Sequence, residues 1–198
     1  MSKGQFSSIS MCLVIEMIIK AFWVLKNGLR YLGYSDYKNL LCVHPDTSIE
    51  KASNATLRVG SGFRTRRNVE LNVREAAELT IGANVFLNTG CIITVRENLC
   101  IGEGTIFGPN VMVFDHDHKM VDGRVQGNEF DTAPISIGKR VWIGAGSIIL
   151  KGSVIEDDCV IAAGSVVKGT VPQGSVLIQS KNTRVKPLMH GNKEGKEG

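Results

Sequence analysis

The sequence predicts an all-β solenoid built from triangular coils, and three observations support that fold. Apolar residues recur every six positions, small residues stand four positions after them, and every insertion into the pattern falls at the same point of a coil. A repeat of six fits neither the 3.6-residue period of a helix nor a long strand with a period of two. It fits short strands joined by tight turns, three of which close one coil of about 18 residues.

The repeat has twelve apolar positions in a common register. They are Ile81, Leu87, Ile93, Ile101, Phe107, Val113, Ile137, Ile143, Ile149, Ile155, Ile161 and Val167. Ten of the twelve residues four positions further on are small or β-branched, which suits a narrow interior, and the two exceptions are Glu97 and Asp117. Glycine directly follows five of the apolar positions, where we expect it to allow the corner conformations.

The insertions all leave the coil at one corner. The spacing between neighbouring apolar positions rises to ten, eight and 24 residues at three places, which are Leu71 to Ile81, Ile93 to Ile101 and Val113 to Ile137. When the chain is divided into six-residue units, three to a coil, each insertion follows the third unit of its coil. We therefore expect a helical segment and connector at 1–56, a solenoid at 57–172 with a functional loop at 114–136, and a C-terminal extension with a polar tail at 173–198.

Composition narrows the class of protein. The net charge of +4 is too small and too dispersed to predict a nucleic-acid-binding protein. The five cysteines are an odd number without a C-x-x-C pair, which argues against a disulfide framework and a zinc ribbon. We expect them to be small buried thiols in a reducing cytoplasm.

Residues 8–33 read as a helix with a narrow polar stripe. Glu16, Lys20 and Asn27 lie on that stripe and the other faces are mostly apolar. The two charges interrupt the apolar run, so neither a transmembrane helix nor a signal peptide is predicted. The broad apolar face should be buried, either against the protein or a second subunit, or on a membrane surface with Lys26 and Arg30 near the headgroups. We expect a cytoplasmic protein, with the inner face of the membrane as the alternative location.

Two motifs accompany the repeat. Gly-Pro-Asn-Val-Met-Val-Phe-Asp-His-Asp-His-Lys-Met, at 108–120, opens the long insertion, and Val141-Trp142-Ile143-Gly144 is followed by Ala-Gly-Ser-Val-Val at 163–167. Over roughly residues 57–185 the chain resembles the hexapeptide-repeat O-acetyltransferases of sugars and related alcohols, which include maltose, galactoside, streptogramin and capsular-polysaccharide O-acetyltransferases. The resemblance implies a left-handed parallel β-helix, a homotrimer, acetyl-coenzyme A as donor, no required metal and a sugar or saccharide acceptor.

The resemblance also implies roles for individual residues. His118 falls at the spacing of the family's catalytic histidine, and Asn88 matches its acceptor-binding asparagine. Trp142 would lie along the pantetheine arm of coenzyme A, with Ala145 and Ala163 presenting backbone groups to it. The chain departs from the family's usual residues at 168–170 and 180–184, where Lys168 and Arg184 are the expected partners of the coenzyme's phosphates.

The chemistry of acetyl transfer explains why a histidine matters. An alcohol is a poor nucleophile at neutral pH, and an imidazole with a pKa of about 6.5 is available as a base. His118 is our predicted base, and His116 is the alternative base and an acceptor contact; Asp115, Asp117 or Glu129 would orient the imidazole. The His-x-His pair also suggests a metal, but the solenoid offers no third histidine.

Several of these residues also have purely structural interpretations. Asn88 would cap a turn in that case, and Trp142 would cover the core. Five arginines crowd the first coil, as a solvated surface or as a contact for an anionic polysaccharide; these are Arg58, Arg64, Arg66, Arg67 and Arg74.

The sequence therefore predicts an acetyl-coenzyme-A-dependent O-acetyltransferase that modifies a sugar hydroxyl, with a cell-surface saccharide or its precursor as acceptor. Asn88 and a backbone N–H near a coil corner are candidates to stabilise the developing oxyanion. The alternatives are an O-acetyltransferase of an antibiotic or small soluble sugar, and a β-helix scaffold without catalysis.

Overall fold

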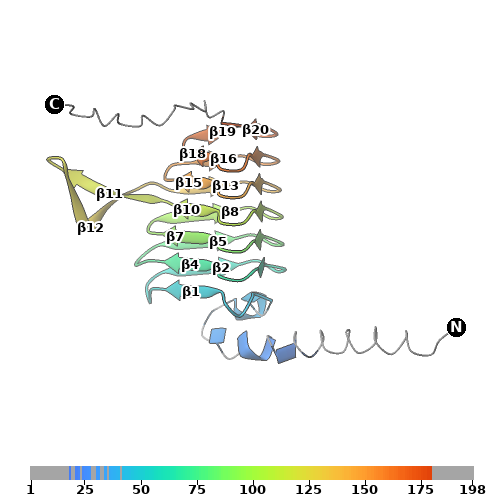
Figure 1. The fold of residues 1–198 in the computed structure, drawn as a ribbon. Helices are drawn as coiled ribbons and strands as arrows, with labels where there is room; N and C mark the ends of the chain where they lie inside the picture. The colour runs from blue at the N-terminus through green and yellow to red at the C-terminus, as the bar shows by residue number, and fades with distance from the viewer. Residues whose placement is uncertain are drawn as a thin grey trace, which may run out of the picture.

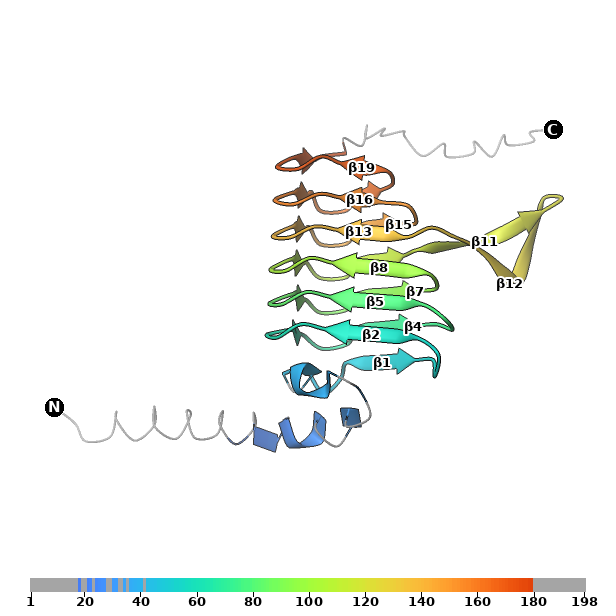
Figure 2. The same ribbon diagram turned by 180° about the vertical axis from the view of Figure 1, so that it is seen from behind.

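The computed structural model describes residues 18, 21–22, 24–27, 30–31, 34, 36–40 and 42–179 of the 198-residue chain. Short parallel strands wind into a stack of coils, and one antiparallel hairpin projects sideways from the stack (Figure 1). Seen from behind, the hairpin still stands clear of the coils (Figure 2). The predicted all-β solenoid of parallel coils is confirmed.

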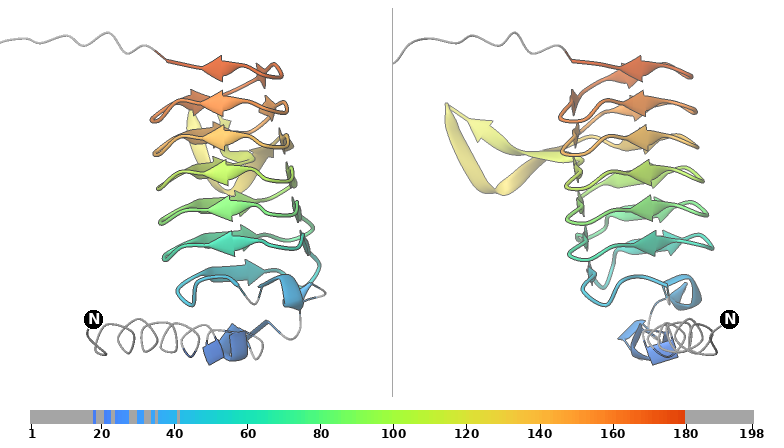
Figure 3. Two further views of the ribbon diagram at one scale, coloured as in Figure 1. Left: turned by 90° about the vertical axis from the view of Figure 1, so that its right-hand side faces the viewer. Right: turned by 45° about the vertical axis from the view of Figure 1, so that its right-hand side comes forward.

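Each side of the triangular stack is a parallel sheet of six strands, and strands of successive coils lie directly above one another (Figure 3). Sheet A contains β1 (Ser48–Lys51), β4 (Glu70–Val73), β7 (Ile92–Val95), β10 (Met112–Phe114), β15 (Ile148–Leu150) and β18 (Val166–Val167). Sheet B contains β2 (Thr56–Val59), β5 (Glu78–Ile81), β8 (Asn98–Ile101), β13 (Ile135–Ile137), β16 (Val154–Ile155) and β19 (Thr170–Val171). Sheet C contains β3 (Arg64–Thr65), β6 (Phe86–Leu87), β9 (Ile106–Phe107), β14 (Trp142–Ile143), β17 (Val160–Ile161) and β20 (Val176–Leu177). The strands thus extend beyond 57–172 at both ends.

The core runs through the centre of the stack as a column of apolar side chains. All twelve residues of the six-residue register are at most 2% exposed, and the ten small or β-branched residues four positions later are also buried. Glu97 and Asp117, the two exceptions, are exposed where the chain leaves the coil. The cysteine prediction holds only in part, because Cys91 and Cys159 fit this interior while Cys42 and Cys100 are exposed on the surface.

The glycines after the apolar positions serve close packing between coils, so the expectation that they adopt special corner conformations was wrong. A Cβ built on Gly108 would lie 2.6 Å from the backbone nitrogen of Ala145 in the next coil, and one on Gly144 would lie 2.5 Å from that of Ala163. Neither has a positive φ. The left-handed conformation belongs to the residue two positions later in the turn, such as Asn110 (φ 56°) or Gly146 (φ 67°).

Only one of the three corners of the triangle varies in length from coil to coil. The AB corner, where the chain passes from sheet A to sheet B, carries every insertion, as predicted. Its largest insertion forms the hairpin of β11 (His116–Val121) and β12 (Arg124–Thr132), paired in antiparallel register. The corner from sheet C to sheet A, here the CA corner, is a tight turn in every coil, because each turn stacks on the next through bonds such as Gly146 N–H to Pro109 O at 2.8 Å.

The first coil is closed by the segment that precedes it. This segment includes a 3₁₀ helix at Tyr37–Leu40 and helical conformation at the described residues between 18 and 31. Asn27 is buried and donates through Nδ2 to Val43 O at 2.8 Å, and the buried Tyr31 hydroxyl donates to Thr47 O at 3.3 Å. Most of the predicted 8–33 helix, including Glu16 and Lys20, lies outside the described residues.

For the residues described, the exposure of this segment excludes one of the predicted locations of its apolar face, which is burial against the rest of the chain. Ile18, Phe22 and Leu25 are exposed, whereas Asn27, from the polar stripe, is buried because it reaches a backbone carbonyl beneath the first coil. The two other predicted locations, contact with a second subunit and contact with a membrane surface, are still open for these side chains. Among the described residues, no helix combines the length and apolar content needed to cross a bilayer.

Candidate active site

The hairpin is fixed to the solenoid at its base by Asp115. This buried carboxylate accepts hydrogen bonds from the backbone N–H groups of Arg96 and Glu97 at 2.8–3.0 Å, one coil below. The Asp115 carbonyl accepts from Ala133 N on the returning strand at 2.9 Å. Both ends of the insertion are therefore held together, which gives the loop a rigid base although its tip is solvated.

Two cations hold the outer part of the hairpin. Lys151 donates to the carbonyl of Asp131 at 3.0 Å and pairs with Asp117 at 3.3 Å. The Arg96 guanidinium lies over the Phe130 ring at 3.4 Å, a cation–π contact that links the solenoid to β12. Neither Arg96 nor Phe130 was predicted as a site residue. The six-residue spacing does place Arg96 directly after a predicted strand, at the corner where the insertions occur. This position is the signal by which Arg96 could have been predicted as a site residue.

His116 and His118 both contact the Phe130 ring. The ring centroids of His116 and Phe130 are 5.4 Å apart, and those of His118 and Phe130 are 4.7 Å apart. His116 Nδ1 lies 3.1 Å from a carboxylate oxygen of Asp115, and its side chain is only 13% exposed. His116 is thus packed against the base of the hairpin.

His118 is exposed, and its partner is a backbone carbonyl. Its Nδ1 lies 3.3 Å from Gln126 O across the hairpin. A carbonyl can only accept, so this contact requires the hydrogen on Nδ1 and leaves the lone pair of the neutral ring on Nε2. In the neutral ring, Nε2 is then the nitrogen that can accept a proton, which is what a general base requires.

The acidic residues proposed to orient an imidazole have different partners. Asp115 contacts His116, Asp117 pairs with Lys151, and Glu129 pairs with Lys119 at 3.0 Å. The hydrogen bond that Lys119 donates to Glu129 raises the pKa of Lys119. The orienting contact of His118 that the structure gives is therefore the Gln126 carbonyl.

Three of the other predicted residues lie together at the CA corner. Asn88 begins this turn in its coil, and Ala145 and Ala163 occupy it in two consecutive coils, joined by Gly164 N–H to Ala145 O at 2.8 Å. Asn88 Oδ1 accepts from Thr89 N at 2.8 Å, so its turn-capping role is present. Trp142 is on sheet C just before this corner, with 56% of its surface exposed, and so does not cover the core.

One chain does not bring the predicted residues into a single site. The histidines project from the AB corner, whereas the group around Trp142 and Ala145 lies at the CA corner and on sheet C. Lys168 is exposed at the AB corner of the last coils, and Arg184 lies outside the described residues. Among the described residues, no three His, Cys, Asp or Glu side chains are placed so that they could hold a metal ion together.

The outer surfaces of the three sheets differ in polarity. In sheet C the residues in register on the outside are mostly apolar and partly or largely exposed, and the row consists of Arg64, Phe86, Ile106, Trp142, Val160 and Val176. In sheet A the outer row is polar in the first two coils, at Ser48 and Glu70, and apolar above them, at Ile92, Met112, Ile148 and Val166. The row on sheet B is mostly polar and comprises Thr80, Cys100, Ser136, Val154 and Thr170. Two of the three faces are therefore suited to contact with another surface.

Comparison with known proteins shows which proteins this solenoid resembles. The family described as bacterial transferase hexapeptide (six repeats) matches residues 134–169, which contain the strands from β13 to β18. The chain is thus similar to hexapeptide-repeat acetyltransferases, and its hexapeptide repeats indicate that the solenoid is a left-handed β-helix.

Individual relatives fit this class. Nodulation protein L of Rhizobium meliloti is 40% identical over 102 residues, which cover 52% of this chain and 56% of the relative. Galactoside O-acetyltransferase of Escherichia coli is 32% identical over 100 residues, covering 50% and 49%. WbbJ of Escherichia coli, named provisionally as an O-acetyl transferase of lipopolysaccharide biosynthesis, is 25% identical over 150 residues, covering 71% and 76%. The chain thus spans about half the length of the first two relatives.

A solved structure supports the fold. AntD, an N-acyltransferase from Bacillus cereus solved as a variant with dTDP and coenzyme A, superposes with a TM-score of 0.61 at 16% identity, covering 81% of this chain and 88% of AntD. At this level of identity the similarity concerns the fold alone.

Proposed function

We propose that the protein is an acetyl-coenzyme-A-dependent O-acetyltransferase that acts on a sugar hydroxyl. The observation that carries the proposal is the exposed His118, whose Nδ1 contacts the Gln126 carbonyl on a hairpin inserted into an acetyltransferase-family solenoid. The names of galactoside O-acetyltransferase and WbbJ favour oxygen as the acylated atom and a cell-surface saccharide or its precursor as acceptor.

In this proposal His118 Nε2 removes the proton from the acceptor hydroxyl as the oxygen attacks the thioester carbonyl carbon. The C–S bond then breaks, the acetyl group stays on the sugar oxygen, and the proton passes to the thiolate that leaves. General base catalysis of this kind is worth about 10²–10⁴ in rate. The Asn88 amide group is the proposed donor to the developing oxyanion, because its oxygen is already engaged by Thr89 N and its donor end is Nδ2.

The proposed coenzyme groove lies along the exposed Trp142 and the CA corner. The backbone at Ala145 and Ala163 approaches the neighbouring coils closely because small residues fill this turn, and an extended pantetheine chain can follow such a surface. Arg184, beyond the described residues, is a proposed partner of the coenzyme's phosphates, and Lys168, which lies at the AB corner, is proposed to reach them from a neighbouring subunit.

Because the histidines and the groove lie on different corners, we propose that the active site forms between subunits of a homotrimer. A cyclic trimer joins two different surfaces of each subunit, one against the other. Sheets A and C, which share the CA corner, carry apolar rows on their outer faces and supply two such surfaces. His118 of one subunit would then face the Trp142 groove of the next.

We further propose that the protein acts in the cytoplasm, at the inner face of the membrane. The exposed Ile18, Phe22 and Leu25, together with the exposed Lys26 and Arg30, form the kind of surface that lies in the headgroup region of an anionic bilayer. The rival occupant of this apolar surface is a second subunit, and pelleting with anionic vesicles separates the two.

The test of the proposed activity is release of free coenzyme A thiol from acetyl-coenzyme A over a panel of acceptors. Saccharide precursors, small soluble sugars and alcohol-bearing antibiotics are the three arms, and the product is analysed for an O-acetyl ester. Preference for the saccharide arm supports the proposal, and preference for either other arm selects the corresponding alternative. No thiol release with any arm, despite coenzyme binding, would favour a scaffold.

A further inference from the structure

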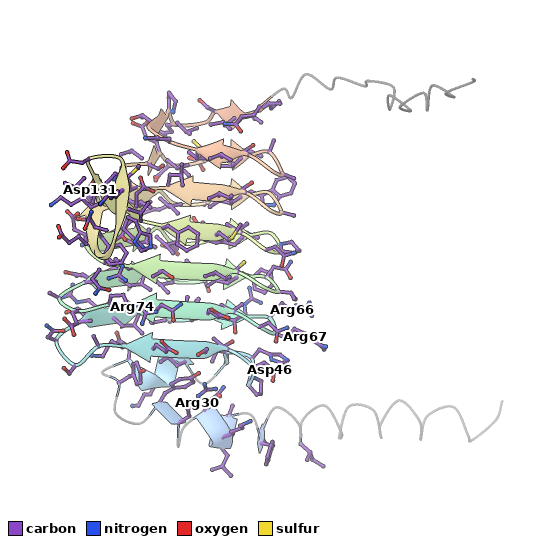
Figure 4. All side chains as sticks on the ribbon, turned by 60° about the vertical axis from the view of Figure 1, so that its left-hand side comes forward. Arg30, Asp46, Arg66, Arg67, Arg74 and Asp131 are labelled. Atoms are coloured by element: carbon purple, nitrogen blue, oxygen red, sulfur yellow. The ribbon has the colours of Figure 1, made fainter. Side chains whose placement is uncertain are left out.

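A surface cavity of about 830 Å³ lies at the AB corner of the first coils. Its charged lining consists of Lys51, Arg74 and Arg96 with Glu50 and Glu75. Figure 4 shows Arg74 on the same side of the molecule as Asp131 of the hairpin and below it, whereas Arg66 and Arg67 lie at a different corner. The arginines of the first coil are therefore not one patch, and the cavity combines one of them with Arg96 of the next coil.

Each of the two arginines that line the cavity has one N–H hydrogen-bond donor without an acceptor. Nε of Arg74 and Nε of Arg96 are buried and have no hydrogen-bond partner among the described residues. Leaving a buried donor unpaired costs about 1–3 kcal/mol, and more when the group is charged. Burial, and next the charge of Arg74, lower the pKa of Arg96 more than the Asp115 carboxylate raises it, so the two guanidinium groups repel each other. Such an arrangement is stabilised by a negatively charged ligand.

The other contacts of these cations leave room for that ligand. Arg74 Nη1 lies 3.4 Å from Glu50 Oε2, at the long end of hydrogen-bond distances. Arg96 stacks on Phe130 through the face of its guanidinium, which leaves the donors at its edge. Lys51 donates to the carbonyls of Ala52 and Ala55, both at 3.0 Å, so one of its three protons is left.

We propose that this cavity binds an oxyanion, a phosphate or a carboxylate, carried by the acceptor saccharide, with Arg74 and Arg96 as its ligands. The proposal rests on the function proposed above and names the acceptor as an acidic or phosphorylated sugar. The volume suits a mono- or disaccharide unit. Phe130 connects the two sites, because its ring contacts Arg96 and both hairpin histidines. An anion held by Arg96 would thus anchor the acceptor beside the hairpin that carries His118.

The test measures binding by the protein without acetyl-coenzyme A. Glucose 1-phosphate, glucuronate and neutral glucose are titrated into the full-length chain while the arginine Nε–H signals are followed by ¹⁵N NMR. We expect both anions, or the one whose chemistry the acceptor shares, to shift the Nε–H signals of Arg74 and Arg96, and glucose to shift neither. Arg74→Gln and Arg96→Gln should each weaken anion binding by about tenfold or more.

Two control variants separate anion binding from a structural effect. Arg58→Gln removes an arginine that pairs with Glu78 on sheet B, outside the cavity, and should leave the anion affinity unchanged. Phe130→Leu removes the stacking partner of Arg96 but neither cavity charge, and should change affinity by less than about threefold. Equal affinity in the wild type, Arg74→Gln and Arg96→Gln, or no anion-dependent shift of either signal, would overturn the proposal.

The transfer assay distinguishes this proposal from the proposed function. Acetyl transfer to neutral sugars without anion binding would refute the anion site and leave the acetyltransferase intact. Anion binding at Arg74 and Arg96 without transfer to any acceptor would keep the site and refute the acetyltransferase. If both hold, an anionic acceptor should show a lower KM than its neutral analogue, and Arg74→Gln should abolish that difference.

Discussion

At the residue scale, burial divides the described cysteines into two chemical kinds. Cys91 points into the solenoid, where its thiol lies 3.2 Å from Gly108 O, and burial raises the pKa of this thiol to about 11. Cys100, in contrast, is on the outer surface of sheet B. Since the thiolate is the nucleophile, reactivity depends on both the pKa and the exposure of each thiol.

We expect Cys100 to react with an alkylating reagent at pH 8 while Cys91 stays unmodified in the native protein. At that pH a thiol with a pKa near 11 is almost entirely protonated, and access is closed as well. Mass spectrometry of proteolytic peptides after timed labelling measures both sites. Labelling in denaturant, where both should react at similar rates, is the control, and rapid native labelling of Cys91 would contradict the buried position.

The residues of the candidate site show where sequence reasoning stops at this scale. The spacing of the Gly-Pro-Asn motif identifies His118, but the Nδ1 contact with Gln126 O depends on how the hairpin pairs. The same holds for Arg96 over Phe130, residues 34 positions apart that meet only because the chain leaves and re-enters the same corner. Partners fixed by tertiary geometry carry no local pattern in the sequence.

At the scale of elements, successive coils lie so close at the corners that a side chain does not fit between their backbones. The strands of each sheet pair in parallel register, and at the turns a side chain would intrude between successive coils. The six-residue period predicts the strands and the inward residues because one geometry repeats at every coil. The packing role of these glycines could not be predicted from a single coil, because the backbone atoms that they contact belong to the next coil.

We expect Gly144→Ala to lower the free energy of unfolding by about 1–3 kcal/mol, because the added Cβ overpacks a backbone contact that cannot move alone. The nearest backbone atom would be only 2.5 Å away. Urea denaturation followed by circular dichroism measures the change. Gly127→Ala in the hairpin is the matched control, because a Cβ there meets nothing within 4 Å. Equal destabilisation by the two substitutions would show that coil contact does not set the effect.

At the scale of the whole molecule, the three faces have different partners in the proposed trimer. Sheets A and C carry apolar outer rows, while sheet B carries polar side chains and faces solvent. The sequence predicts the alternation of inward and outward residues on every face. It does not by itself reveal how the outer rows combine, because residues of one row come from coils about 18 positions or more apart.

We expect Ile106→Asp, on sheet C, to dissociate the trimer into monomers, because a carboxylate would be buried in an apolar interface. Val154→Asp, on sheet B, is the matched control and should leave the trimer intact, since it introduces the same charge at a similarly exposed position, 39% against 47%. Size-exclusion chromatography with light scattering gives both masses. A monomeric wild type at micromolar concentration, or a trimeric Ile106→Asp, would contradict the proposed interface.

The measurement that tests the central claim most directly is steady-state kinetics of His118→Ala and His116→Ala, with coenzyme binding followed by calorimetry. We expect His118→Ala to lose about 10²–10⁴ in kcat while its affinity for coenzyme A is nearly unchanged, since the base acts on the acceptor and the proposed groove is built from residues on other elements. His116→Ala should lose much less, as it is packed against Asp115 rather than presented to solvent. If His118→Ala keeps more than about a tenth of the wild-type kcat while His116→Ala is inactive, the roles of the two histidines are reversed. If both variants remain active, the base does not lie on this hairpin and the proposed mechanism is wrong.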